Sequence, residues 1–513
     1  MYSRTLLLSL TAAAAATAQN YDLDKRTAGR LGSTLTIEVG AAPANQFVLF
    51  VPSTTAGPTP LALIDPNDPR SLSVGIDLLG SLTVALTSPT GVASLSLALP
   101  NAPTLNGYEL HGQTVMLALG ANFFGQMSND VVCQLGVGDT AVPSSSALSA
   151  SRALASGFVD RDNNGGQYDV VISGGGTGSL TAATGLASTE LWDFRHLRVQ
   201  LGAPMTTPRA LHLSVPLTNG RVLLIGGANA TGGVLASCEV YDPATNLFTA
   251  TGSMSTPRIL HAACRLADGR VMVAGGTSTL QPDALTAISS ALSSVEIWDP
   301  ATGLWTPTAS ISGPRLGLAL SRLPNGQIMV SGGVQYSVII IVPNATSVAT
   351  VQRWNPATGT WSNGPNMGQP RAGHHYNQVT LADGRILMTG GINITSLLTA
   401  ATTTPFNGAE AYNPTTNSWA TYNMPPARVL HSATRLADGR VVVCGGSQGT
   451  LTGTTPIANV DVFNPATNTW AAGLPLLAPR AGHVAELTPD GMLVLFGGQD
   501  ATATISTFET LRF

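Results

Sequence analysis

The chain has almost no lysine. Lys25 is the only one in 513 residues, charged residues make up 10% of the sequence, and the formal net charge is -4. This composition argues against a polybasic surface that would bind nucleic acid or an anionic membrane. The body of the chain also has no lysine that could form a Schiff base or bind the phosphates of a nucleotide. This argues against Schiff-base enzymes and against proteins with a lysine-containing phosphate-binding loop.

Cysteines and aromatic residues are also scarce. The four cysteines, Cys133, Cys238, Cys264 and Cys444, show no C-x-x-C spacing, and aromatic residues are 5% of the chain. Cys444 occupies an apolar position of a repeated strand, which predicts a buried structural thiol. The sequence does not decide whether Cys238 and Cys264 form a disulfide. Plentiful glycine, threonine, serine and valine predict an all-β protein of many short strands.

Long apolar runs are missing after the first residues of the chain. Residues 1–18 combine Arg4, an apolar run and a small-residue end at Ala16-Thr17-Ala18. This pattern is typical of a signal peptide, so we expect a protein that is secreted, extracellular or periplasmic and has no membrane span. A short segment, residues 19–28, follows, and Lys25-Arg26 within it is a candidate processing site.

Residues 29–137 contain short alternating runs separated by glycine, proline and asparagine clusters. Such spacing predicts a small β-sandwich domain. We find no cluster of catalytic residue types in it, and His111 is interpreted as a surface or packing residue.

A repeat dominates the chain after residue 140, and residues 428–470 show it most clearly. Each copy has an arginine, a strand, a tight turn, a second strand ending in two glycines, and a third strand ending in an aromatic residue before Asp-Pro or Asn-Pro. The paired glycines recur seven times, at residues 174–175, 226–227, 275–276, 332–333, 390–391, 445–446 and 497–498.

The period of about 50 residues and the recurring motifs resemble the kelch-repeat β-propeller, the central domain found in the galactose oxidase superfamily. The resemblance covers residues 138–513 and implies seven blades of four antiparallel strands. The last copy ends after its third strand. We therefore expect residues 140–146 to supply the fourth strand and to close the ring by pairing with the C-terminal blade.

Histidines recur three residues after the arginine in five copies. A ring of histidines suggests a metal site, but equivalent positions in different blades rarely converge on one ion, so structural pairing is favoured. Two copies, those of Arg152 and Arg315, lack the histidine. If the repeated residues bind anything, they would form a binding face together with Arg315. The candidate residues are Arg209, His212, Arg258, His261, Arg315, Arg371, His374, Arg428, His431, Arg480 and His483.

The predicted propeller also resembles the catalytic domain of the copper-radical oxidases. That resemblance implies a tyrosine directly before a copper-binding histidine at the start of an inner strand. Here leucine takes that place in Leu211-His212, Leu260-His261 and Leu430-His431. The resemblance therefore covers the scaffold and not the copper site, and no cofactor is expected.

Asp160, Asp162 and Asn164 stand at alternate positions, as oxygen ligands do in calcium loops. The loop lacks the acid at its twelfth position, and an ordinary Asn-Gly turn is the preferred interpretation. Calcium binding stays a weak alternative.

These patterns predict a non-catalytic, monomeric scaffold that binds an unidentified protein or carbohydrate. The variable loops after the paired glycines, residues 277–294, 334–349 and 392–407, are where a partner would bind. Two alternatives stay open: a copper or sugar-active enzyme on the same scaffold, and a calcium-dependent surface adhesion protein. A sugar-active enzyme would need two converging carboxylates, yet the recurring acids Asp268, Asp383 and Asp438 are predicted to lie in hairpin turns.

Overall fold

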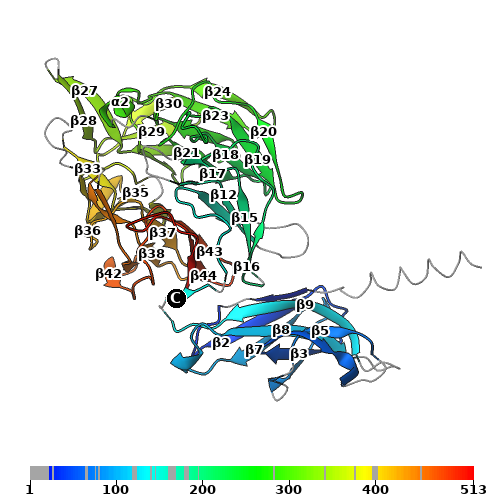
Figure 1. Cartoon of the computed structure of the whole chain (residues 1–513). Helices are drawn as coiled ribbons and strands as arrows, with labels where there is room; N and C mark the ends of the chain where they lie inside the picture. The colour runs from blue at the N-terminus through cyan, green and yellow to red at the C-terminus, as the bar shows by residue number, and fades with distance from the viewer. Residues whose placement is uncertain are drawn as a thin grey trace, which may run out of the picture.

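The computed structural model describes residues 22–25, 28–63, 68–75, 77–78, 81–117, 124–138, 141–144, 146–159, 169–177, 184–194, 196–280, 284–339, 342–374, 377–395, 403–450 and 453–513. Two bodies are visible in Figure 1: a small β domain at the N-terminus and a large ring of sheets.

The N-terminal domain contains two main sheets that share one apolar core. Leu35 and Ile37 of the first sheet and Val48, Phe50 and Val131 of the second belong to the same buried cluster. The first sheet has the order β1 (Asp22–Lys25), β2 (Thr34–Gly40), β7 (Ala93–Ala98), and the second β6 (Thr83–Leu86), β3 (Phe47–Ser53), β8 (Glu109–Leu117), β9 (Phe124–Gln134). A hairpin, β4 (Ala56–Pro60) and β5 (Ser71–Val74), and two 3-10 turns, η1 (Leu61–Leu63) and η3 (Pro103–Leu105), complete the domain.

Strand β1 corrects the domain boundary expected from the sequence. It lies in the segment 19–28, which was set apart from the domain, and it pairs with β2 from Asp22 opposite Gly40 to Lys25 opposite Ile37. Its single buried leucine, Leu23, gave too short an apolar pattern to be recognised as a strand.

The rest of the chain forms four-stranded antiparallel sheets, which we number as blades 1–7 in chain order. Blade 1 contains β11 (Ser156–Val159), β12 (Asp169–Ser173), β15 (Thr189–Asp193) and β16 (Arg198–Leu201). Blade 2 contains β17 (Leu213–Pro216), β18 (Val222–Ile225), β19 (Cys238–Asp242) and β20 (Leu247–Thr251). Blade 3 contains β21 (Ala262–Arg265), β22 (Val271–Ala274), β23 (Val295–Asp299) and β24 (Leu304–Thr308).

Blades 4–7 repeat this order. They are β25 (Ala319–Arg322), β26 (Ile328–Ser331), β29 (Val351–Asn355), β30 (Thr360–Asn363); β31 (Gln378–Thr380), β32 (Ile386–Thr389), β35 (Gly408–Asn413), β36 (Ser418–Asn423); β37 (Ser432–Arg435), β38 (Val441–Cys444), β41 (Val460–Asn464), β42 (Thr469–Ala472); and β43 (Val484–Leu487), β44 (Met492–Phe496), β45 (Phe508–Arg512), β10 (Ala141–Pro143).

Strand β10 comes from the region of residues 140–146, far from blade 7 in the sequence. Ala141, Val142 and Pro143 pair with Leu511, Thr510 and Glu509 of β45. The start and the end of the ring therefore share one sheet, and β10 covers the edge that β45 would otherwise expose.

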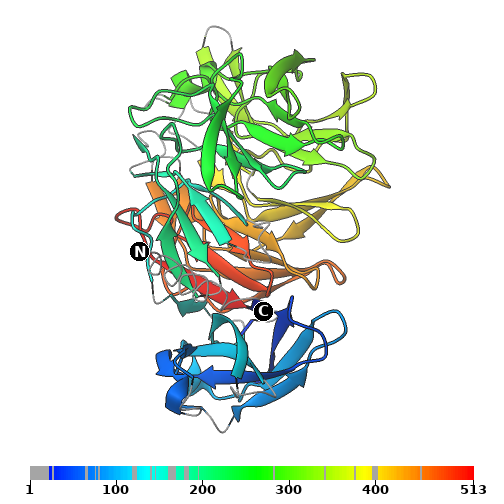
Figure 2. The same ribbon diagram turned by 90° about the vertical axis from the view of Figure 1, so that its right-hand side faces the viewer.

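The core lies between the blades. The second strands of blades 2–6 are buried at every residue, because a neighbouring blade covers each face. This explains their continuous apolar sequences, such as Val222–Ile225, where a half-exposed strand would alternate. Figure 2 shows the blades fanned above the N-terminal domain.

Insertions between the second and third strands of several blades fold on one side of the ring, which we call the loop face. They are β13 (Gly176–Thr177) with β14 (Thr184–Gly185), α2 (Ala284–Ser289), β27 (Val334–Ile339) with β28 (Val342–Ser347), β33 (Ile392–Ile394) with β34 (Thr403–Pro405), and β39 (Ser447–Thr450) with β40 (Gly453–Pro456). We call the opposite side, with the tight turns between first and second strands, the turn face.

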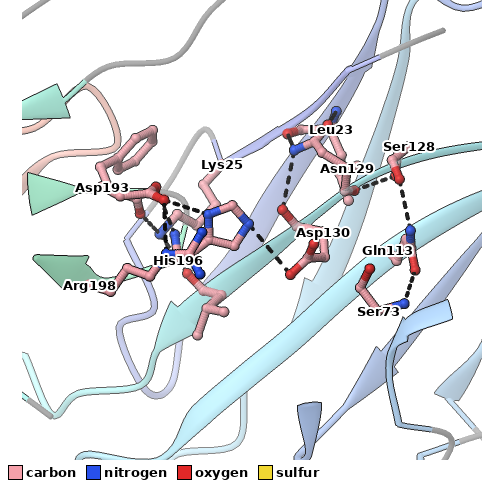
Figure 3. A network of polar contacts seen from close by, with 12 residues as sticks. Leu23, Lys25, Ser73, Gln113, Ser128, Asn129, Asp130, Asp193, His196 and Arg198 are labelled. Atoms are coloured by element: carbon pink, nitrogen blue, oxygen red, sulfur yellow. Dashed lines mark hydrogen bonds and ion pairs between the residues drawn. The ribbon is translucent and has the colours of Figure 1, made fainter. Parts of the chain in front are cut away.

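The N-terminal domain is fixed to blade 1 by buried and charged contacts (Figure 3). The Lys25 ammonium donates to the carbonyls of Val132 and Phe194, both at 2.6 Å, and lies 4.6 Å from the centroid of the Phe194 ring. Burial lowers the pKa of Lys25. The His196 ring, in blade 1, contacts Asp193 at 2.6 Å and Asp130 of β9 at 3.5 Å. The sole lysine is thus part of the junction between the two bodies.

Candidate functional site

The repeated arginines are buried structural residues. Each of the seven donates through Nη1 to the carbonyl of the first paired glycine in its own blade, at 2.8–3.2 Å. In six blades the other end of the guanidinium contacts a carboxylate of the third strand. The pairs are Arg152–Glu190, Arg209–Glu239, Arg258–Glu296, Arg371–Glu410, Arg428–Asp461 and Arg480–Glu509.

Blade 4 departs from this pattern, because Gln352 stands where the other blades have an acid. Arg315 is only 1% exposed and bonds instead to Ser312, Gly332 and Thr350 oxygens. Burial lowers the pKa of Arg315 to about 10. The blade therefore holds a buried cation without the carboxylate that its neighbours supply.

The repeated histidines pack between blades. The His212 ring lies against Gly174 of the preceding blade, and its Nε2 is 3.1 Å from Ser173 Oγ. The His431 ring likewise lies against Gly390, and its Nε2 is 2.8 Å from Thr389 Oγ1. Burial lowers the pKa of His212 and of His483 to about 3, so both rings are neutral at physiological pH.

The paired glycines carry the bonds that join the blades. The second glycine of each pair donates its N–H to the carbonyl of the arginine that opens the next blade, at 2.8–3.1 Å. The series includes Gly498 to Arg152, which joins blade 7 to blade 1. Because the second glycines have φ between 86° and 102°, other residues would be strained there.

The eleven residues predicted as a binding face are therefore interior. Ten are at most 3% exposed, and His483 is half-buried. A partner on the surface would not reach the arginines, which corrects that hypothesis: their side chains point into the blades to satisfy backbone carbonyls. The acids were missed because the nearer histidine was taken as the arginine's partner. Their signal is an acid two residues before the third-strand aromatic residue, as in Glu239-Val240-Tyr241 and Glu296-Ile297-Trp298.

The surface available to a partner on the loop face is built by the insertions of blades 3–6. One buried cluster contains Ile288 of α2, Val334 and Ala345 of the β27–β28 hairpin, and Ile392 and Ile394 of β33. The hairpins are thus anchored to each other and to the strand starts beneath them, and Figure 1 shows β27, β28 and β33 projecting at one side of the ring. Val338 remains 57% exposed.

A cavity of about 300 Å³ lies between the inner strands at the centre of the ring. Its lining includes His431, Ser432, Gln378, His483 and Glu486. Burial raises the pKa of Glu486 to about 7. The recurring acids of the tight turns lie elsewhere: Asp268, Asp383 and Asp438 pair with Arg270, Arg385 and Arg440 at 2.6–2.7 Å on the turn face.

Comparison with known proteins supports the repeat assignment. A family model described as the kelch motif matches residues 258–312 and 430–473. The chain therefore carries kelch motifs. The chain is similar to two curated relatives, the spermatocyte protein spe-26 of Caenorhabditis elegans (27% identical over 40% of this chain and 33% of the relative) and the kelch-like protein terF of Aspergillus terreus (25% identical over 41% of this chain and 44% of the relative). The matches span less than half of each relative.

The fold of this chain is also similar to that of a solved structure. A fungal alcohol oxidase of the AA5 family, in complex with copper, superposes with a TM-score of 0.53 at 17% identity, over 72% of this chain and 75% of that one. This likeness concerns the fold. The kelch propeller predicted from the repeats, and its all-β class, are confirmed.

The residues described do not fit a copper site of the tyrosine-cysteine type. Leu211, Leu260 and Leu430 stand before the histidines with φ between 50° and 57°. All four cysteines are free thiols, and none shares a buried apolar cluster with a tyrosine among the described residues. The Cys238–Cys264 disulfide left open by the sequence is therefore not formed, and Cys444 is buried as predicted.

Two further observations concern metals and membranes. Within the described ranges, no group of three or more His, Cys, Asp or Glu side chains has the arrangement to hold a metal ion. The calcium candidates Asp160, Asp162 and Asn164 lie outside the described residues. Among the described helices, none is long and apolar enough to cross a bilayer.

Proposed function

We propose that this kelch-repeat protein is an exported, non-catalytic binding module that holds a protein or glycan partner on its loop face. The kelch repeats indicate a protein-interaction module. Export is supported by the signal-like residues 1–18.

The observation that carries the proposal is the folded state of the loop-face insertions. Three consecutive blades contribute α2 and two hairpins, and buried residues such as Ile288, Ala345 and Ile394 hold them together. A fixed surface built from several loops loses little conformational freedom on binding, which favours recognition of a partner. Val338 is an exposed apolar residue on one of these hairpins.

The test is a protein and glycan array probed with residues 19–513 and with two single variants. V338D places a charge on the loop face, while L304D places one at an equally exposed position, 60% against 57%, on an outer strand of blade 3. We expect partners that bind the parent and L304D but not V338D. Partners lost only in L304D would place recognition on the outer rim and contradict the proposal, as would an array without specific partners.

A further inference from the structure

Three arginines end inner strands at the turn face, and all three line one cavity. They are Arg265 of β21, Arg322 of β25 and Arg435 of β37, and the cavity has a volume of about 870 Å³. Among the described residues that line it, none is a carboxylate. We call this cavity the turn-face mouth.

The guanidinium groups at the mouth are only partly used by the fold. Each donates through Nη1 to one carbonyl of the preceding blade: Arg265 to Pro216 at 2.9 Å, Arg322 to Leu266 at 3.3 Å and Arg435 to Thr380 at 3.0 Å. A guanidinium carries five N–H donors, so one bond leaves most of its capacity for another acceptor.

The charges of these arginines are also uncompensated. Within the described part of the chain none of the three forms a salt bridge, whereas Arg270, Arg385 and Arg440 on the same face pair with aspartates. Three positive charges therefore surround one hollow in a chain whose net charge is -4. Such a hollow concentrates anions, because its walls focus the field of the charges.

We propose that the turn-face mouth binds a small polyanion that carries two or three carboxylate or phosphate groups. Guanidinium groups match both anions by paired hydrogen bonds. The arginines come from blades 3, 4 and 6, so they approach the cavity from separate directions and suit an anion with several charged groups. The cavity volume lies within the usual range of small-molecule sites, about 300–1,000 Å³.

Glu486 of blade 7 lines the adjoining parts of the channel and not the mouth itself. Each of the two cavities that Glu486 lines shares wall residues with the mouth. The central cavity shares Ser214 and Val215, and the other shares Ser214 and Pro216. The polyanion site is on the opposite side of the ring from the loop face, so this inference does not depend on the proposed partner surface.

The test is isothermal titration of the full protein at low salt with citrate, pyrophosphate and, as a neutral control, glucose. We expect citrate or pyrophosphate to bind, with affinity that falls as salt rises, and glucose not to bind. Binding of citrate alone assigns a carboxylate ligand, and binding of pyrophosphate alone assigns a phosphate ligand. The absence of binding by both anions at millimolar concentration would overturn the proposal.

The triple variant R265Q/R322Q/R435Q removes the charges but keeps an N–H group that can reach the neighbouring carbonyl. We expect its anion affinity to fall at least tenfold, while R270Q, whose arginine is already paired with Asp268, binds like the parent. If the triple variant does not fold, R322Q and R435Q, which alter exposed side chains, are measured singly and each should weaken binding. Unchanged affinity in folded variants would show that the arginines only brace the blades.

Discussion

Arg315 shows how much one residue of the repeat contributes to a blade. In its blade Gln352 takes the place of the acid. The Ser312 N–H donates to Gln352 Oε1 at 2.9 Å, as the N–H of Ser255 donates to Glu296 at 2.7 Å in blade 3. We predict that Q352E restores the carboxylate and raises the free energy of unfolding by about 1–3 kcal/mol, because a charged hydrogen bond replaces a neutral one. Urea unfolding of parent and variant measures the change.

The matched control is E296Q in blade 3. It leaves Arg258 buried without its partner, and we expect a loss of about 3–5 kcal/mol. If Q352E were destabilising while E296Q behaved as expected, the oxygens of Ser312, Gly332 and Thr350 would already satisfy Arg315 fully.

The second glycine of each pair is constrained by space as well as by backbone angle. A Cβ at Gly446 would lie 2.8 Å from the His431 Cβ and 2.9 Å from the Val429 oxygen. Gly439, in the preceding turn, has a similar φ of 90° but nothing within 4 Å. We predict that G439A costs about 1–2 kcal/mol from backbone strain. G446A should cost about 3–5 kcal/mol, since overpacking adds to the strain. If thermal unfolding showed that G439A and G446A lose the same stability, a steric contribution at Gly446 would be ruled out.

At the scale of elements, the turn after β15 is held to β9 by a titratable group. Hydrogen bonds to Asp130 and then to Asp193 raise the pKa of His196 to about 9. A folded pKa above the ordinary value of 6.5 means that the stabilisation is complete below about pH 6.5 and is lost as pH rises through 9. We predict that the parent loses about 2–4 kcal/mol more stability than H196Q between pH 6 and pH 10.

The measurement is urea unfolding at several pH values for both proteins. H196Q is the reference, because glutamine keeps a polar side chain but does not titrate. Parallel pH profiles for parent and H196Q would mean that the contacts with Asp130 and Asp193 do not hold the protonated ring.

Elements that repeat could be predicted from the sequence, and elements that occur once could not. The paired glycines and the aromatic residues recur in phase, and their period identified the propeller. The acid before the aromatic residue recurs equally well. Its partner, however, is the arginine that lies 29–39 residues earlier in six blades, and a local sequence pattern does not connect residues so far apart. The Lys25 and His196 contacts join segments with no repeat at all, so only the fold reveals them.

At the scale of the whole molecule, ring closure depends on β10. Val142 is fully buried where the N-terminal domain, at Gly107 and Gly136, meets blade 7. We predict that V142D lowers the free energy of unfolding by at least about 4 kcal/mol, because an unpaired carboxylate would be buried and the pairing with β45 would weaken. V84D, at a valine that is 54% exposed in the N-terminal domain, should change stability by less than about 1 kcal/mol.

Hydrogen exchange locates the effect of V142D within the ring. If β10 closes the propeller, exchange should increase first in its partner β45 and then in the rest of blade 7, because the ring opens at the blade that chain start and chain end share. Blade 4, on the far side of the ring, should keep its protection under the same conditions. Uniform acceleration in all blades would mean that the propeller unfolds as one unit and that no single blade acts as its closure.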